Sequence, residues 1–316
     1  MKKKIPDTNI FSSKLVFIGG HSKCGKSFLC PIVSSLKNSE MFICEPVSEN
    51  IYYTYYLQKM DYDFAKFFLK RIYNERVHNL SIGRNLNKRI NDYSSILNFK
   101  DPNIYFKREN SSAKQLYKNY NTKSFYPIMF HDVMLSPNIL LDSFKNAKII
   151  YIDRHPVDMI IEWEKNGYYG EVYSNKKNTT LSFKYKDKLY PYWWLGDEEK
   201  FSKINNNFEK IILSLEKIYI KQKKNFLRFK KKYPKKFFYV NFDEMTEKTD
   251  FTVKNISKFL NTKQDNKTNT IINKENGNRK IDTKDRLVKR DHILRQVSNK
   301  YHKIFINLEK IYEKTI

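Results

Sequence analysis

The sequence predicts an α/β fold with a central parallel sheet flanked by helices. Short apolar runs alternate along the chain with stretches of helical periodicity, and the first apolar run passes through a glycine-bearing turn directly into a helix. The chain has 316 residues, of which 40% are apolar, so it can bury a core of this type. We expect a single domain over residues 1–316.

Five segments have the length and composition of buried strands. They are short and rich in β-branched or aromatic residues, and they cover residues 14–18, 40–46, 125–132, 147–156 and 236–245. The clearest is "AKIIYIDRHP" at 147–156, because four apolar residues lead into a polar turn. These five segments are the predicted strands of the parallel sheet.

Helices are expected between these strands in the first half of the chain. One runs from Lys26 to about Leu36, with Pro31 in or near its first turn. A second helix follows the strand at 147–156 and ends near Gly167. Aromatic and aliphatic residues at helical spacing also predict a helix within residues 50–120.

The second half is expected to be mainly helical. An amphipathic basic helix is predicted over 200–232, a helix capped by Asp250 follows the last strand, and a C-terminal helix covers 285–314. Residues 170–192 lack periodicity and are expected to form a loop or lid. Residues 261–280 are polar and are expected to be flexible.

The formal net charge of +26 would attract polyanions such as nucleic acid, membrane surfaces or a phosphorylated cofactor. The lysines, however, run along the whole chain instead of forming one stripe, and no nucleic-acid-binding module is recognisable. A basic nucleic-acid binder therefore ranks last among the functions considered, and no nucleic-acid partner is expected.

Cysteine usage and the absence of long apolar runs favour a cytoplasmic protein. Cys24, Cys30 and Cys44 are too few for a disulfide framework and indicate a reducing compartment. The N-terminal "MKKKIPDTNIFSS" lacks the apolar stretch of a signal peptide, and no run approaches the ~18 apolar residues of a membrane-spanning helix. No metal-ligand spacing is present, and the sequence does not indicate an oligomeric state.

Residues 20–27, "GHSKCGKS", form a phosphate-binding loop (P-loop) pattern, G-x-x-x-x-G-K-S. A strand that turns into a helix directs backbone N–H groups and the positive end of the helix dipole at one point. Gly20 and Gly25 allow a close backbone approach, Lys23 and Lys26 add charge, and Ser27 adds a hydroxyl. One hypothesis is a kinase or NTPase that uses Mg-ATP, in which Lys26 reaches the phosphates and Ser27 holds Mg²⁺. Asp153, after the apolar "IIYI", would be the aspartate that such proteins have at the end of a second apolar strand.

Three segments resemble sulfotransferases that use 3′-phosphoadenosine-5′-phosphosulfate (PAPS). "GHSKCGKS" is similar to the first motif of that family, with Lys23 at its basic position. "IIYIDRHPVDMIIEWE" resembles the segment that binds the 3′-phosphate, with Arg154, Pro156 and Asp158 at the R-x-P-x-D positions. "FFYVNFDEMTEKTDFTVKNISKFLN" resembles the closing strand and helix. The resemblance implies a sulfotransferase-like fold of the P-loop type.

The resemblance also implies how the cofactor binds. The loop from Gly20 through His21, Ser22, Lys23, Cys24, Gly25, Lys26 and Ser27 would hold the 5′-phosphosulfate of PAPS. Arg154 would pair with the 3′-phosphate through its fork of N–H donors, and Lys23 would neutralise the leaving group as the sulfuryl group moves. No metal is expected.

The chain departs from the family pattern at three places. Glu162 occupies the position, eight residues after Arg154, where the family usually has a serine that also binds the 3′-phosphate. The glycine-rich C-terminal motif is absent, although Arg279 and Lys280 in "ENGNRK" are candidates to replace it. Lys26 stands where the family prefers Thr or Ser. A sulfotransferase fold without activity is therefore a further alternative.

Two residues are candidates for the base that removes the proton of the acceptor hydroxyl. Glu45 follows the second strand, as in the tyrosylprotein and some carbohydrate sulfotransferases that it resembles here. His131 lies where the cytosolic small-molecule enzymes have a histidine. The acceptor is expected to be a hydroxyl-bearing small molecule or carbohydrate, with a lipid as another candidate. Trp193 and Trp194 are expected either to stack on a sugar or to belong to the core.

Overall fold

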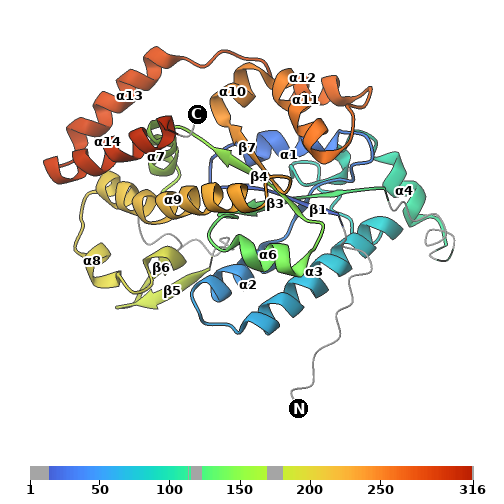
Figure 1. The fold of residues 1–316 in the computed structure, drawn as a ribbon, viewed down its shortest axis with the longest axis horizontal. Coiled ribbons are helices and arrows are strands. Elements are labelled where there is room, and N and C mark those ends of the chain that lie inside the picture. The colour runs from blue at the N-terminus through green and yellow to red at the C-terminus, as the bar shows by residue number, and fades with distance from the viewer. Residues whose placement is uncertain (1–13, 113, 115–122, 169–180, 315–316) are drawn as a thin grey trace.

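The computed structural model describes residues 14–112, 114, 123–168 and 181–314. Its centre is a five-stranded parallel sheet in the order β2-β3-β1-β4-β7 (Figure 1). These strands are β1 (Leu15–Gly20), β2 (Ile43–Cys44), β3 (Tyr126–His131), β4 (Lys148–Asp153) and β7 (Phe237–Asn241). All five predicted strands are present and pair in parallel, which confirms the predicted fold class.

Helices cover both faces of this sheet (Figure 1). In chain order they are α1 (Lys26–Ser34), α2 (Pro46–Tyr56), α3 (Tyr62–Ile82), α4 (Asn103–Glu109), α6 (Pro137–Ser143), α7 (Pro156–Lys165), α8 (Glu198–Ser202), α9 (Asn207–Lys232), α10 (Phe242–Glu247), α11 (Thr249–Leu260), α12 (Thr268–Lys274), α13 (Thr283–Gln296) and α14 (Asn299–Glu313). A hairpin of β5 (Ser182–Tyr185) and β6 (Lys188–Pro191) and two 3₁₀ turns, η1 (Ile96–Asn98) and η2 (Tyr192–Trp194), complete the described elements.

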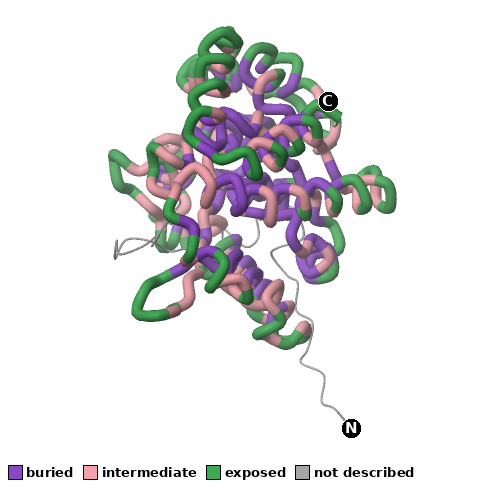
Figure 2. The backbone as a smooth tube through the Cα atoms, turned by 90° about the vertical axis from the view of Figure 1, so that its left-hand side faces the viewer, coloured by how far each residue is buried: buried purple, intermediate pink, exposed green. Residues whose placement is uncertain are grey.

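Alternate residues of each strand belong to two separate hydrophobic cores. Leu15 and Phe17 point to the face covered by α2, α3, α6, α7, α9, α13 and α14. Val16 and Ile18 point to the other face, which α1, α4, α10, α11 and α12 cover. Because both faces are buried, the strands read as continuous apolar runs in the sequence. Figure 2 shows this buried centre inside an exposed outer layer.

The carboxyl ends of the strands bring the predicted site residues to one edge of the sheet. Gly20 at the end of β1 pairs with His131 at the end of β3, and Asp153 at the end of β4 pairs with Asn241 at the end of β7. Parallel sheets commonly bind ligands at this edge. Register therefore explains why residues far apart in the chain meet there.

Two predicted helices are shorter than expected. The helix predicted over 200–232 begins at residue 207, because Asn206 is extended and its side chain accepts a hydrogen bond from the N–H of Glu209. The helix predicted over 285–314 is two helices, α13 and α14. Val297 and Ser298 between them have extended backbone, which ends one helix and begins the next.

Tertiary contacts explain three further differences. Residues 261–280, expected to be flexible, contain α12, whose Ile271 and Ile272 are buried against the second core. The predicted loop at 170–192 contains the β5–β6 hairpin, whose turn residues Lys186 and Asp187 both have positive φ; residues 169–180 lie outside the described part. Asp250 lies in the first turn of α11 and not at its N-cap, which is Lys248.

Candidate active site

The phosphate-binding loop lies between β1 and α1. Gly25, the N-cap of α1, has φ 105°, a conformation that residues other than glycine rarely adopt. A Cβ at Gly25 would stand 2.5 Å from Phe242 Cδ2, so the close contact with Phe242 and the positive φ both favour glycine at this position. The first N–H groups of α1 have no acceptor within the helix by geometry. Together with the helix dipole they form a cradle that can hold an anion, and the strand–loop–helix arrangement is the one expected for residues 20–27.

Side chains of the loop divide into internal supports and groups at the surface. The Lys26 ammonium is buried and donates to the carbonyls of Gly20 at 3.2 Å and His21 at 2.6 Å. Cys24 is also buried, and burial raises the pKa of its thiol. Ser27, in contrast, is exposed. Lys26 and Cys24 therefore stabilise the loop in this structure, whereas the Ser27 hydroxyl is accessible to a phosphate.

The second predicted anion-binding residue, Arg154, adjoins this loop. Its Nη1 donates to the carbonyl of Lys23 at 2.8 Å, and the guanidinium lies over the Phe242 ring at 4.6 Å. The Arg154 Nε is buried and has no acceptor in the part of the chain that the structure describes. A buried guanidinium N–H without an acceptor, beside the cradle, fits an anionic ligand that contacts both.

A second guanidinium, that of Arg279, lies close enough to Arg154 to affect it. Burial and then the positive charge of Arg154 lower the pKa of Arg279. The Arg279 guanidinium lies over the Phe28 ring of α1 at 5.3 Å. Two like charges held together repel each other, and a bound anion would remove that repulsion. The structure thus places Arg279, which is a candidate to replace the missing C-terminal motif, close to Arg154.

His131, at the end of β3, forms a pair with Glu49 on α2. Its Nδ1 lies 3.0 Å from Glu49 Oε1 and 3.2 Å from Oε2, and its backbone N–H donates to the same Oε1 at 2.7 Å. A carboxylate can only accept hydrogen bonds, so Nδ1 carries the proton and Nε2 is the nitrogen with a free lone pair. The His131 side chain is 36% exposed, so a substrate can reach the imidazole.

Glu45, the other predicted base, is buried and has two partners. Its carboxylate accepts from the Val47 N–H at 3.3 Å, as the N-cap of α2, and it forms an ion pair with Arg76 of α3. Only 3% of the Glu45 side chain is exposed. These contacts describe a residue that joins α2 to α3, and they leave it less available than His131 to accept a proton.

Helix α7 carries the rest of the R-x-P-x-D segment. Asp158 pairs with Arg286 of α13, which also binds Asp243 of α10, so this aspartate ties the C-terminal helices to the site. Trp163 Nε1 donates to the carbonyl of Ser22 at 3.0 Å and so fixes the loop from the α7 side. Glu162 is half-buried on the same helix, with no ion pair to its carboxylate among the described residues.

The loop rests on a buried polar network centred on Asp132. The carboxylate of Asp132 lies 2.8 Å from His21 Nδ1 and accepts from Gln222 at 2.7 Å and Tyr192 at 2.8 Å. Burial alone would raise the pKa of Asp132, but its hydrogen bond to His21 and the charges of His21 and His131 hold that pKa below its usual range. The side chain of His21 is therefore held in the interior, so only its backbone faces the loop that is expected to bind the cofactor.

Asp153 is buried in a neighbouring network of polar side chains. Its carboxylate forms a buried ion pair with Lys223 of α9 and accepts from Tyr239 at 2.9 Å and Tyr219 at 3.3 Å. The side chain of Asp153 is fully buried. An aspartate already paired in the core is a poor candidate for the Mg²⁺-binding aspartate of a kinase or NTPase.

The two tryptophans belong to the hydrophobic core. Trp194 is 2% exposed, stacks on Phe201 with ring centroids 4.1 Å apart, and donates from Nε1 to Ser214 at 2.9 Å. Trp193 packs against Trp163 with centroids 5.8 Å apart. The structure therefore favours the core alternative of the two that the sequence left open.

Several residues of the site were not predicted from the sequence. They are Glu49, Asp132, Gln222, Tyr192 and Phe242, and each reaches the site from an element whose placement is decided by packing. Gln222 and Tyr192 lie on α9 and η2, far from the loop in the chain. Phe242 and Asp132 did have a nearby signal, because they lie within the predicted strands at 236–245 and 125–132.

Taken together, the parallel sheet, the loop after β1 and the guanidinium after β4 define an α/β protein with two neighbouring candidate anion sites at one sheet edge. A family profile described as "Sulfotransferase domain" matches residues 13–307. The chain belongs to the sulfotransferase family. This confirms the resemblance and the transferase class predicted from the sequence, with PAPS as the sulfuryl donor of that class.

Comparison of structures gives matches to sulfotransferases at low identity. The sulfotransferase domain from the Synechococcus PCC 7002 olefin synthase has 12% identity and a TM-score of 0.44, with 98% of each chain covered. The domain from the curacin biosynthetic pathway has 12% identity and a TM-score of 0.42, with 81% of this chain and 76% of that chain covered. A mouse sulfotransferase complexed with PAP has 14% identity and a TM-score of 0.37, with 94% and 83% covered. No curated protein sequence matched this chain.

The described part of the chain holds no helix that is both long and apolar enough to cross a membrane.

Proposed function

We propose that this sulfotransferase moves the sulfuryl group of PAPS to a hydroxyl of a carbohydrate or lipid, with His131 as the general base. The observation that carries the proposal is the meeting of three groups at one sheet edge: the cradle after β1, Arg154 against the Lys23 carbonyl, and the His131–Glu49 pair. The cradle can hold one end of the donor, Arg154 can hold the other end, and His131 can accept a proton.

The donor-binding roles follow from the anion sites. The N–H groups at the start of α1, with Lys23 and Ser27, would hold the 5′-phosphosulfate. Arg154, supported by Arg279, would hold the 3′-phosphate, because its guanidinium at the edge of the cradle has an N–H that finds no acceptor among the residues that the structure describes. When bound, PAPS supplies an activated sulfuryl group and a phosphate leaving group.

The proton of the acceptor hydroxyl would pass to Nε2 of His131. Glu49 holds Nδ1, which fixes the tautomer and stabilises the imidazolium that forms. His131 is preferred to Glu45 because the Glu45 carboxylate is buried against Arg76 and the start of α2. Glu45 is then a structural residue at the edge of the site.

Binding of adenosine 3′,5′-bisphosphate, the product form of the donor, tests this assignment. The chain should bind it equally well with and without Mg²⁺. Arg154→Ala should weaken binding about ten- to a hundredfold, since a hydrogen bond to a charged group contributes about 1.5–3 kcal/mol. Arg71→Ala, which removes an exposed arginine of α3, is the control for lost charge and should leave binding unchanged. Tight Mg-ATP binding with no binding of the bisphosphate would contradict the proposal.

Acceptor and compartment are separate parts of the proposal. Transfer of labelled sulfuryl groups from PAPS to a panel of sugars, lipids and small alcohols would identify the acceptor, and labelling of none of them would contradict the hydroxyl assignment. The three cysteines are all free thiols, which supports a reducing, cytoplasmic location.

A further inference from the structure

Arg286 of α13 binds two carboxylates that belong to two other helices. Its Nε and Nη2 donate to Asp158 Oδ2 at 3.0 and 2.7 Å, and its Nη1 and Nη2 donate to Asp243 Oδ2 and Oδ1 at 2.7 and 2.9 Å. Asp158 lies in the first turn of α7, and Asp243 lies in the first turn of α10. Helix α13 packs beside α7 (Figure 1). One guanidinium, of which only 14% of the side chain is exposed, therefore joins three helices.

Both aspartates adjoin residues of the candidate active site. Arg154 lies two positions before the start of α7, and Phe242 is the first residue of α10, directly before Asp243. The Arg154 guanidinium lies over the Phe242 ring at 4.6 Å, so this contact spans the junction of the two helices that Arg286 joins. A cation and an aromatic face attract each other only at short range, so the contact depends on the spacing of α7 and α10.

Helix α10 also supports the second guanidinium of the site. The backbone N–H of Arg279 donates to the Thr246 carbonyl of α10 at 3.1 Å. This helix has six residues, and a helix of that length is not stable by itself. Its position therefore depends on tertiary contacts, among them the pair between Asp243 and Arg286. A shift of α10 would move Arg279 and the ring beneath Arg154 together.

Asp158 and Asp243 would repel each other without Arg286. Both carboxylates accept from the same Nη2, so they lie on either side of one nitrogen atom. Among the described residues, Arg286 is the only cation that pairs with Asp243, and Lys289, which lies 4.0 Å from Asp158 Oδ1, also pairs with Asp285 of its own helix. Removing one partner of a largely buried ion pair leaves the remaining charge uncompensated. Loss of Arg286 would therefore push the starts of α7 and α10 apart.

We propose that Arg286 is a positioning residue for the 3′-phosphate end of the donor site. By holding the starts of α7 and α10 together, it keeps the Arg154 guanidinium on the Phe242 ring and Arg279 close to it. The inference rests on the proposed function, in which Arg154 binds the 3′-phosphate. The cradle for the other end of the donor is built from β1 and α1, so binding of a 5′-phosphate is expected to depend much less on Arg286.

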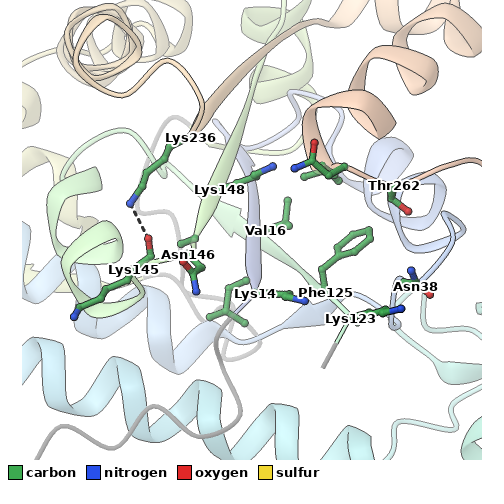
Figure 3. Close-up of a pocket in the computed structure, with 14 residues that line it drawn as sticks. Lys14, Val16, Asn38, Lys123, Phe125, Lys145, Asn146, Lys148, Lys236 and Thr262 are labelled. Carbon is green, nitrogen blue, oxygen red and sulfur yellow. Dashed lines mark hydrogen bonds between the residues drawn. The ribbon is translucent and has the colours of Figure 1, made fainter. Parts of the chain in front are cut away.

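A lysine-rich cavity at the opposite end of the sheet does not offer a comparable site. It has a volume of about 520 Å³ and lies where the strands begin. Lys145, Lys148 and Lys236 line it, and their side chains point in different directions, so their ammonium groups do not meet at one point (Figure 3). Nucleotide binding measured on the full chain is therefore expected to report the edge of the sheet that carries the cradle.

Adenosine 3′,5′-bisphosphate and adenosine 5′-monophosphate separate the two ends of the site, because only the bisphosphate has a 3′-phosphate. Calorimetry on the full chain gives both affinities, below the thermal midpoint of each variant. Arg286→Gln should lower the affinity for the bisphosphate at least fivefold and that for the monophosphate less than twofold. The control Arg290→Gln makes the same change of charge one turn later on α13 and breaks the pair with Glu309 of α14 instead, so both affinities should stay within twofold.

Arg286→Lys provides the test if Arg286→Gln does not fold. Lysine keeps the charge but lacks the planar fork that binds both carboxylates, so the bisphosphate affinity should fall at least threefold while the monophosphate affinity is kept. Unchanged bisphosphate affinity, equal losses for the two nucleotides, or an equal loss in Arg290→Gln would each overturn the inference. If the unsubstituted chain itself binds the bisphosphate no more tightly than the monophosphate, the proposed function fails, and this result is seen before any variant is compared.

Discussion

Replacing Glu49 with glutamine tests how the proposed base is held. Glu49 contacts two groups of His131: Nδ1 lies 3.0 Å from Oε1 and 3.2 Å from Oε2, and the backbone N–H donates to Oε1 at 2.7 Å. Glutamine has nearly the same shape, but its amide carries no charge. The change therefore removes the electrostatic stabilisation of a protonated His131 while it keeps the packing of α2.

The size of the effect follows from these contacts. A hydrogen bond to a charged group contributes about 1.5–3 kcal/mol, and each 1.4 kcal/mol of barrier corresponds to about a tenfold change in rate. We expect Glu49→Gln to lower kcat about ten- to a hundredfold. His131→Ala, which removes the base itself, should lower kcat about 10²- to 10⁴-fold.

The assay is transfer of labelled sulfuryl groups from PAPS, with bisphosphate binding measured on the same variants. Glu49 and His131 do not belong to the donor-binding groups, so bisphosphate affinity should stay within about twofold while kcat falls. Glu45→Gln is the matched control on the same helix. It removes a carboxylate that caps α2 and binds Arg76, so it should lower the free energy of unfolding by about 1 kcal/mol and change kcat only a few-fold.

The opposite pattern would refute this reasoning. If His131→Ala kept near-normal kcat while Glu45→Gln lost a hundredfold or more, Glu45 would be the base. If Glu49→Gln lowered bisphosphate affinity as strongly as kcat, the pair would support the cradle instead of the proton transfer.

Three further predictions concern the cradle and its supports. Glu162→Ser should tighten bisphosphate binding about fivefold, because like charges 4 Å apart in water repel by about 1 kcal/mol; unchanged affinity would mean that this carboxylate faces away from the 3′-phosphate. Gly25→Ala should lower the free energy of unfolding by about 2–4 kcal/mol, because its φ is 105° and the new Cβ would stand 2.5 Å from Phe242. Gly167→Ala is the control: its φ is 70° and no atom of the described residues lies within 4 Å of the new Cβ, so only the backbone cost of about 1–2 kcal/mol is expected. Equal losses of stability in thermal melts would contradict the clash with Phe242. Burial, and then the charge of Arg286, lower the pKa of His155 from 6.5 to about 4. The unfolded chain therefore binds this proton at a higher pH than the folded chain, and the free energy of unfolding should fall by about 3 kcal/mol as the pH drops from 6.5 towards 4. In urea titrations His155→Asn, which can still cap α7 at Val157, should flatten this pH dependence, and an unchanged pH dependence would exclude His155 as its source.

The strand, loop and helix that contain residues 20–27 were predicted well because their determinants are local. Apolar residues 15–18, a glycine that permits positive φ, and helical periodicity after residue 26 are all read within one short window. The same holds for Arg154, which follows a clear strand and precedes a helix. The sheet order β2-β3-β1-β4-β7, in which β1 and β4 are neighbours, then brings these two strand ends together.

Helix ends were predicted less well because packing and capping decide them. The periodicity of residues 285–314 continues through the break at Val297, and only the extended backbone there separates α13 from α14. Similarly, the polar composition of 261–280 hides Ile271 and Ile272, which pack against the second core. Composition averages over a window, whereas burial selects individual side chains.

The sequence alone therefore determined the α/β class, the parallel strands and the positions of the loop after β1 and of Arg154 after β4. Only the tertiary structure decided that Glu49 contacts Nδ1 of His131, since the two residues are 82 positions apart, and that Lys223 holds Asp153 in the core. It also decided that the lysines at the starts of four strands surround one cavity. The physical reason is range: backbone propensity and periodicity act over a few residues, whereas charge pairing and burial act between segments that meet only when the chain folds.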